Sequence, residues 1–422
     1  MRNPMNQWMN PAGVSPERIR RGLALGAILL LWWDPSGGLT SALLAGLGVY
    51  ALLNVRKTAA AWRHPAGVLF GLGVLWAVLS LAWSFDPGGT GRDLSKSLPM
   101  VLGVFALPLI LDRPGRIWFA LTASAGAVTV RLALDLIRVF RALGWPEVLS
   151  EARYFQTYLY THPNVSSMMA GLCVLILLAR GLAGAPGLLR KLALALGIGV
   201  NLAYLLVMAS RGPQVVFALM LLVFPVLVLP GWRVRLAMAG LSLLLGAALL
   251  PVAYWVNPRF SDKTMFNFNR RDTIWGHARM LADRRPVLGY GFGKKAFVKA
   301  VYENPEQRAP MVPVHYPHTH SYWLMLYFQG GRVGFLLWSL GWLALGLRLA
   351  FTTRRFERAE SSWVGRLHAR SLPVLLGLGA AGILVYGIMD FPDHALRQAQ
   401  FYLLGTGMGL TAWRPASTEN DA

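Results

Sequence analysis

The sequence predicts an all-α polytopic membrane protein with about twelve transmembrane helices. Of the 422 residues, 55% are hydrophobic and only 14% are charged, whereas a soluble domain carries roughly 25% charged residues. Apolar runs long enough to cross the ~30 Å hydrocarbon core of a bilayer recur along the whole chain. The runs are continuously apolar rather than alternating, which favours helices over a barrel of strands. We therefore expect residues 1–422 to form one integral membrane domain surrounded by membrane lipids.

The expected spans follow one another with short loops between them, except at one place. Their approximate bounds are 22–33, 38–54, 66–84, 97–111, 117–138, 165–182, 192–209, 213–230, 234–256, 321–347, 372–389 and 398–413. The first run is short for a full crossing. A long polar segment, residues 257–320, separates the ninth run from the tenth, and a polar tail, residues 414–422, follows the last.

The distribution of basic residues predicts the orientation. The net charge is +22, and Lys and Arg gather in alternate short loops, as they do in the cytoplasmic loops of membrane proteins. Both termini, including the tail 414–422, are therefore expected in the cytoplasm. The 257–320 segment falls on the opposite, periplasmic or outer, side. In a soluble protein this charge would suggest nucleic acid; here the loops explain much of it, and no nucleic-acid partner is expected.

The large outer loop, residues 257–320, carries eleven Lys and Arg residues against five acids. Long loops are translocated largely regardless of charge, so this placement is permitted. A cationic surface outside the membrane suits anionic phosphates or sugars.

A short helix is expected inside this loop, over Asp272–Arg284. Asp272 or Thr273 would cap it, and its apolar face would consist of Ile274, Ala278 and Leu281. Pro286 would end the helix, and the glycine-rich segment 289–293 would then form a tight turn. Spaced glycines let a backbone approach phosphate, but nothing around them indicates a nucleotide-binding fold.

Two histidines, His318 and His320, close the loop. Histidine is the side chain best able to move protons near neutral pH. His320 directly precedes an apolar helix, and rigid elements position catalytic groups better than loops do. A neutral imidazole there would take the proton from an acceptor hydroxyl. The structural alternative is an interfacial histidine bonded to the loop backbone, and His318 is expected to have a supporting role.

Three arginines are candidates for binding phosphate. Arg211 lies at an outer helix end, where it is either a snorkelling arginine or a clamp with planar, bidentate donors. Arg270 and Arg271 open the loop helix, either as a solvated charge pair or as a second phosphate contact near a helix N-terminus. Asp390, at the outer end of a span, is expected to pair with one of the cations or to form a helix-end turn.

Metal and nucleotide motifs are missing from the sequence. The outer side has no Asp-x-Asp pair and no clustered carboxylates, so we expect no bound divalent metal. There is no P-loop, and no cofactor is expected. The charge of a leaving group would then be stabilised by arginines.

Three segments, in order along the chain, resemble the O-antigen ligase/polymerase family of bacterial membrane glycosyltransferases. Ser210-Arg211-Gly212 is similar to the family's Ser-Arg-Gly at an outer helix end. The segment from Arg271 to Trp275, followed by 286–293, is similar to its Arg-x-x-x-Trp and Pro-x-x-Gly-x-Gly loop. His320-Ser321-Tyr-Trp-Leu, with trailing glycines, is similar to its His-(Asn/Ser)-x-x-Leu segment, although many relatives have asparagine where Ser321 stands.

The resemblance implies a metal-independent glycosyltransferase of the GT-C type in the inner membrane of a Gram-negative bacterium, with its active site facing the periplasm. The donor would be a glycan on undecaprenyl pyrophosphate, and in the ligase branch the acceptor is a sugar hydroxyl of the lipid A–core. Carried over by position, Arg211 and Arg271 would bind the pyrophosphate and His320 would be the general base of an inverting transfer. Trp275 and Ser321 belong to the matched segments and would support the site.

The ligase branch is the reading we favour, because the chain has no second large outer loop and no extra periplasmic domain. The nearest rivals are the polymerase branch, whose acceptor is another lipid-linked repeat unit, and a branch that glycosylates protein hydroxyls. A transporter or flippase for lipid-linked sugars belongs to a different class. It would use the same cationic surface but would not need His320.

Overall fold

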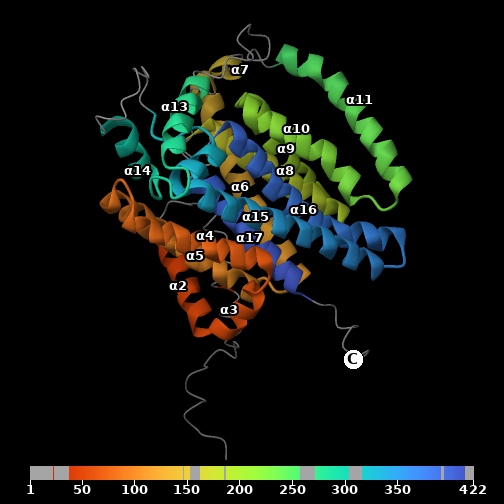
Figure 1. Cartoon of the computed structure of the whole chain (residues 1–422). Coiled ribbons are helices and arrows are strands. Elements are labelled where there is room, and N and C mark those ends of the chain that lie inside the picture. The colour runs from red at the N-terminus through yellow and green to blue at the C-terminus, as the bar shows by residue number, and fades with distance from the viewer. Residues whose placement is uncertain are drawn as a thin grey trace, which may run out of the picture.

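The computed structural model describes residues 22, 38–145, 147–152, 162–184, 187–256, 271–303, 316–390 and 394–413, which form helices and connecting turns without a strand (Figure 1). The helices, in chain order, are α2 (Gly38–Leu53), α3 (Val55–Trp62), α4 (Pro65–Leu79), α5 (Pro87–Ile110), α6 (Pro114–Leu143), α7 (Val148–Glu151), α8 (Pro163–Leu182), α9 (Leu188–Val207), α10 (Arg211–Val228), α11 (Trp232–Val256), α13 (Arg271–Arg284), α14 (Lys294–Val298), α15 (Tyr322–Arg358), α16 (Trp363–Met389) and α17 (His394–Ala412). The polar tail 414–422 lies outside the described residues.

Eight helices of the described segments are long and apolar enough to cross a membrane: α4 with its short 3-10 extension, α5, α6, α8, α9, α10, α15 and α16. A ninth results if α2 and α3, which meet at an angle of 94°, are one broken span. These helices confirm a polytopic helical membrane protein. The count of twelve is not reached: α11 and α17 coincide with two expected spans but are not among the eight, and the first expected span, 22–33, lies outside the described residues except for Gly22.

Helix α8 forms the centre of the bundle. It packs against α6, α9, α10 and α16 (Figure 1), and most of its side chains are buried, including the small polar Ser166 and Ser167. Close contacts between small residues and neighbouring side chains hold the helices together, as where Phe217 of α10 packs on Gly171 of α8. Helix association within lipid depends on such close packing, because the surrounding lipid chains are as apolar as the side chains.

Helix α15 is broken at Gly331, whose backbone has φ +61° and ψ −162°. The break frees backbone groups that a continuous helix would pair, and residues 286–291 supply partners for them. Three hydrogen bonds do this: Tyr290 N to Phe328 O at 2.9 Å, Gly291 N to Gln329 O at 3.0 Å, and Arg332 N to Pro286 O at 2.7 Å. A fourth, from Trp76 Nε1 to Gly330 O at 2.9 Å, comes from α4. Irregular backbone is tolerated at membrane depth only when its polar groups are satisfied in this way.

The glycines of the 289–293 segment are explained by this close backbone approach. A Cβ atom on Gly289 would lie 2.5 Å from the carbonyl oxygen of Gln329, and one on Gly291 would lie 2.3 Å from Oγ of Ser84. Both glycines also have positive φ angles, which other residues rarely adopt. The segment therefore lies between the turn that follows α4 and the broken part of α15.

The helix expected inside the outer loop is present as α13. Its three expected apolar residues, Ile274, Ala278 and Leu281, are all buried, and α13 packs against α15. The expected cap is wrong, because the helix already begins at Arg271 and Asp272 therefore lies in its first turn. An acidic side chain in a first turn still interacts favourably with the positive end of the helix dipole.

Candidate functional site

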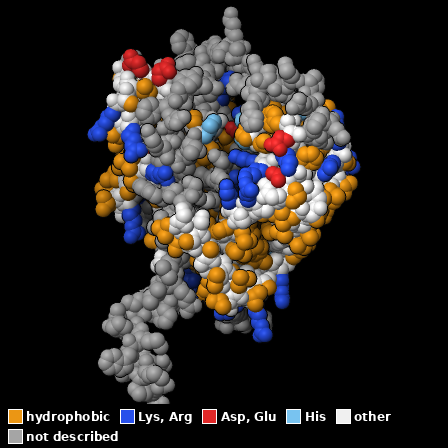
Figure 2. All heavy atoms as spheres, turned by 90° about the vertical axis from the view of Figure 1, so that its left-hand side faces the viewer, with side chains coloured by type: hydrophobic (Ala, Val, Ile, Leu, Met, Phe, Trp, Pro, Cys, Tyr) orange, Lys and Arg blue, Asp and Glu red, His pale blue; other side chains and the backbone are white. Residues whose placement is uncertain are grey.

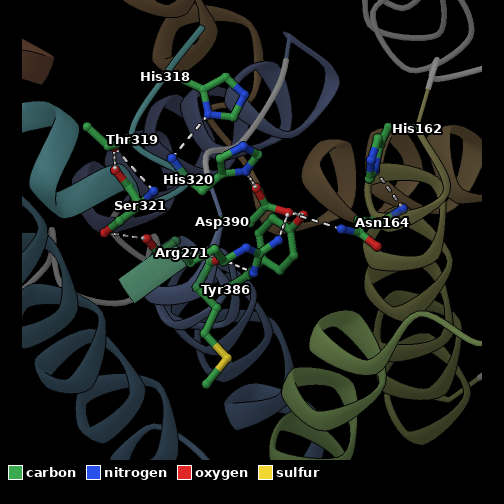
Figure 3. Close-up of polar contacts among 11 residues, drawn as sticks. His162, Asn164, Arg271, His318, Thr319, His320, Ser321, Tyr386 and Asp390 are labelled. Atoms are coloured by element: carbon green, nitrogen blue, oxygen red, sulfur yellow. Dashed lines mark hydrogen bonds and ion pairs between the residues drawn. The ribbon is translucent and has the colours of Figure 1, made fainter. Parts of the chain in front are cut away.

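Asp390 is the centre of a polar cluster at the end of α16 (Figure 3). Its Oδ1 lies 3.3 Å from Nδ1 of His320, and its Oδ2 lies 3.4 Å from Nη2 of Arg271. The same Oδ2 accepts hydrogen bonds from Nδ2 of Asn164 at 3.0 Å and from the hydroxyl of Tyr386 at 3.1 Å. We call these five residues the Asp390 cluster. They come from α8, α13, α16 and the segment before α15.

The carboxyl group of Asp390 is buried and yet ionised. Burial alone would raise its pKa, but the hydrogen bond from His320, the charge of Arg271 and the hydrogen bond from Asn164 together outweigh burial. The pKa of Asp390 is therefore held well below its usual value. A fixed negative charge thus lies at the base of the cluster.

His320 occupies a constrained turn in front of α15. Its backbone has φ +49°, an uncommon conformation for a residue other than glycine. Its N–H donates to Nδ1 of His318 at 3.2 Å, and the two rings lie 4.3 Å apart between centroids (Figure 3). Ser321 caps α15 by accepting from Leu324 N at 3.4 Å. These contacts fix the backbone from which the His320 ring projects.

A second set of contacts anchors the segment that leads to His320. Tyr316 is buried, and its hydroxyl lies 2.6 Å from Nδ1 of His277 on α13. Its N–H donates to the hydroxyl of Tyr302 at 2.7 Å. The start of the His320 segment and the helix that carries Arg271 are therefore joined.

The imidazole of His320 has one nitrogen committed to Asp390. Because an ionised Asp390 can only accept a hydrogen bond, Nδ1 carries the hydrogen, and in the neutral ring the lone pair lies on Nε2. The His320 side chain is 30% exposed, so the ring is accessible from outside the cluster. A histidine held in this way can act as a general base through Nε2.

Arg271 is the first residue of α13 and reaches across to the end of α16. Its Nη1 donates to the carbonyl oxygen of Met389, and its Nη2 pairs with Asp390. A guanidinium has five N–H donors in a planar fork, and these two contacts use two of them. The remaining edge can bind an anion.

Arg211 is placed beside the cluster by its two neighbours. Oγ of Ser210 donates to Oδ1 of Asn164 at 2.5 Å. A Cβ atom on Gly212 would lie 3.8 Å from Cε2 of Tyr386. Arg211, between them, begins α10 and is partly exposed. The turn that carries Arg211 therefore lies against the cluster, on the side of Asn164 and Tyr386.

The structure thus brings together segments that the sequence singled out separately: the Ser210–Gly212 turn, Arg271, His320 and Asp390. Asp390 fills both roles expected for it, because it pairs with a cation and also ends α16. Trp275 lies one turn beyond Arg271 on α13 and is half-buried. Arg270 lies outside the described residues.

Asn164 and Tyr386 are members of the cluster that sequence reasoning missed. Asn164 lies in the first turn of α8, where its N–H donates to Nδ1 of the N-cap residue His162 at 3.2 Å. A polar residue at a helix start is readily taken for a capping residue. Tyr386 lies four residues before Asp390, a spacing that places both on one helix face. That spacing was the available signal.

Residues 192–339 match the family model described as O-antigen ligase. The match includes Arg211, Arg271 and His320, while Asn164 and Asp390 lie outside it. No curated protein matches the chain significantly. The family match implies glycosyl transfer of the ligase or polymerase type. Over residues 192–339, this membrane protein is therefore similar to the O-antigen ligase family.

Proposed function

We propose that this protein is an O-antigen ligase, which transfers a glycan from undecaprenyl pyrophosphate to a sugar hydroxyl of the lipid A–core. The reaction would take place at the periplasmic face of a bacterial inner membrane. The observation that carries the proposal is the Asp390 cluster, in which an oriented histidine and an arginine share one buried carboxylate. The family match over residues 192–339 supports the same class of reaction.

In this proposal His320 activates the acceptor. Nε2 takes the proton from the attacking sugar hydroxyl as the oxygen forms its bond to the anomeric carbon of the donor. Asp390 holds the ring by Nδ1 and stabilises the imidazolium that results. His318 supports the backbone of the turn and does not touch the substrate.

The arginines bind the leaving group, undecaprenyl pyrophosphate. As the new bond forms, the bond from the anomeric carbon to the pyrophosphate oxygen breaks, and negative charge builds up on the pyrophosphate. Arg271 offers the outer edge of its guanidinium, and Arg211 offers a second cation from the start of α10. Fixed positive groups at the point where charge develops are the main source of catalysis in such reactions. Attack opposite the leaving group inverts the anomeric centre.

Reconstitution with defined substrates tests the proposal. The purified protein, in liposomes with lipid-linked glycan and lipid A–core, should yield glycosylated lipid A–core, detected by its mass. His320→Ala should lower the rate by about 100-fold or more, whereas His368→Ala, a histidine near the other end of α16, should not.

The outcomes separate the alternatives. Product from lipid-linked repeat units alone would indicate a polymerase, and product only with a protein acceptor would indicate a protein-glycosylating enzyme. Movement of lipid-linked glycan between leaflets without a new covalent product would indicate a transporter. Transfer by His320→Ala at the wild-type rate would refute the role of the base.

A further inference from the structure

A cavity of about 490 Å³ lies beside the Asp390 cluster but is built from other helices. Its walls come from α4, α5, α14, α15 and α17 and are mainly apolar, with Val78, Leu98, Val101, Leu326, Trp338 and Phe401 among the lining residues. Tyr322 lies between the cavity and the Asp390 cluster. It lines the cavity, and it packs closely on Gly387 of α16: a Cβ atom added to Gly387 would lie 2.9 Å from the Cβ atom of Tyr322. The cavity therefore reaches the first turn of α15, two residues from His320.

The rim of the cavity faces the surrounding lipid. Val78 and Leu98 line it and are 45% and 52% exposed. The first part of α5, residues 87–97, is polar, and apolar sequence begins at Leu98. This change places Lys96 at the depth where lipid headgroups meet hydrocarbon.

Lysines gather at this depth. Lys96, Lys294 and Lys295 all line the cavity. Asp93 is the acidic lining residue, and its Oδ2 accepts a hydrogen bond from the N–H of Lys295 at 3.2 Å. The lysines outnumber it three to one. On the face shown in Figure 2, Lys and Arg side chains gather between a recessed histidine and a broad hydrophobic surface.

A cavity with apolar walls and with lysines at the depth of the lipid headgroups is complementary to an anionic lipid. We propose that this cavity docks the acceptor glycolipid, with one acyl chain between α4, α5 and α15 and a lipid phosphate on Lys96, Lys294 and Lys295. The inference rests on the proposed function and adds the place from which the acceptor approaches.

The direction from which the hydroxyl must attack favours the acceptor, rather than the donor, as the molecule bound in the cavity. Arg211 and Arg271, which would hold the leaving pyrophosphate, belong to α10 and α13, and neither helix lines the cavity. The attacking hydroxyl must approach the anomeric carbon from the side opposite the leaving group. A cavity on α4, α5 and α17, with Tyr322 in its wall two residues from His320, gives the acceptor that side.

Steady-state kinetics of the reconstituted protein provide the first test. A variant with Lys96, Lys294 and Lys295 all changed to Gln should raise the KM for lipid A–core by about tenfold or more, because each lysine near the surface contributes to binding of an anionic lipid. The KM for the lipid-linked donor and kcat should stay within about twofold. Lys299→Gln is the matched control: this lysine is close by but pairs with Asp86 at 4.0 Å outside the cavity.

The acceptor's phosphates provide the second test. With dephosphorylated lipid A–core as acceptor, the wild-type KM should rise and the triple variant should show no further loss. Ala77→Trp, which fills the apolar part of the cavity, should raise the KM for both forms of the acceptor. An increase in the donor KM instead would assign the cavity to the donor and overturn the proposal. Unchanged KM values for both substrates would also overturn it.

A binding measurement without donor keeps this inference separate from the proposed reaction. Lipid A–core should bind the wild-type protein in nanodiscs more tightly than the triple lysine variant, as followed by fluorescence of a labelled lipid. Equal displacement of that lipid by phosphatidylglycerol would show that the site takes any anionic lipid, and would refute the specific assignment. If wild type forms no product but binding depends on the lysines, the proposed function fails while the cavity assignment stands.

Discussion

Asn164 donates its side-chain hydrogen bond to the same oxygen of Asp390 that faces Arg271. The other end of the Asn164 amide accepts from Ser210, the residue before Arg211. One amide therefore connects the turn that carries Arg211 with the carboxylate that holds His320.

Asn164→Ala should lower kcat by about ten- to a hundredfold, because a hydrogen bond to a charged group contributes about 1.5–3 kcal/mol. The KM for the donor should rise as well, since the Ser210 contact is lost together with the contact to Asp390. Asn201→Ala is a suitable control: this buried asparagine of α9 bonds Thr129 at 2.7 Å, away from the cluster. If both variants lose activity equally, the loss reflects stability and not the cluster.

Asp390→Asn should reduce kcat by about 100-fold or more, because the ring of His320 would lose the ionised partner that fixes its tautomer. Substrate KM values should change less than kcat. A variant that kept the wild-type kcat would show that His320 does not need this carboxylate.

The lowered pKa of Asp390 also predicts how stability depends on pH. A carboxyl whose pKa is depressed in the folded state stabilises the fold above its unfolded pKa, and that stabilisation is lost as the pH falls towards the folded value. The difference in unfolding temperature between wild type and Asp390→Asn should therefore shrink as the pH falls below about 4. Thermal unfolding in detergent on both sides of this pH would check it, and a difference that did not shrink there would contradict it.

Gly289→Ala should destabilise the protein by about 1–3 kcal/mol, because the new methyl group would meet the Gln329 carbonyl and the residue has φ +69°. Gly276→Ala on α13 is the matched control. It has open space around it, and alanine favours a helix by up to about 1 kcal/mol. Unfolding temperatures of the two variants should therefore shift in opposite directions. Equal shifts would argue against the close approach of residues 286–291 to α15.

Transfer should proceed without added divalent metal and should be unchanged by a chelator. In the proposed reaction Arg211 and Arg271 supply the positive charge that a metal ion would otherwise provide to the pyrophosphate. Product formation measured with and without chelator, after extensive dialysis of the protein, would test this. Activity that required a restored metal would replace the arginine-only account.

Local features of the sequence predicted much of the architecture. The apolar runs identified most helices, and the spacing of Ile274, Ala278 and Leu281 predicted α13 with the correct buried face. The break in α15 was not predicted, because a glycine such as Gly331 is common in membrane helices and nothing in its neighbours signals a positive φ. The short helix α3, which meets α2 at 94° just beyond the expected span 38–54, was also not predicted.

The candidate site was predicted as single residues but not as an arrangement. His320, Arg211 and Arg271 each lie in a segment with a recognisable motif. Their proximity depends on helix packing, which a single sequence does not reveal. Asn164 stayed hidden because its contact to Asp390 crosses 226 positions of the chain.

The hydrogen bond between Asn164 and Asp390 has a consequence for engineering hybrid enzymes. Both residues lie outside the matched region, residues 192–339, although they bind groups inside it. A chimera that imported only this region from a relative would combine foreign arginines and histidine with a native carboxylate and amide. A chimera should therefore acquire the donor preference of the relative only when the start of α8 and the end of α16, which carry Asn164 and Asp390, come from the same relative.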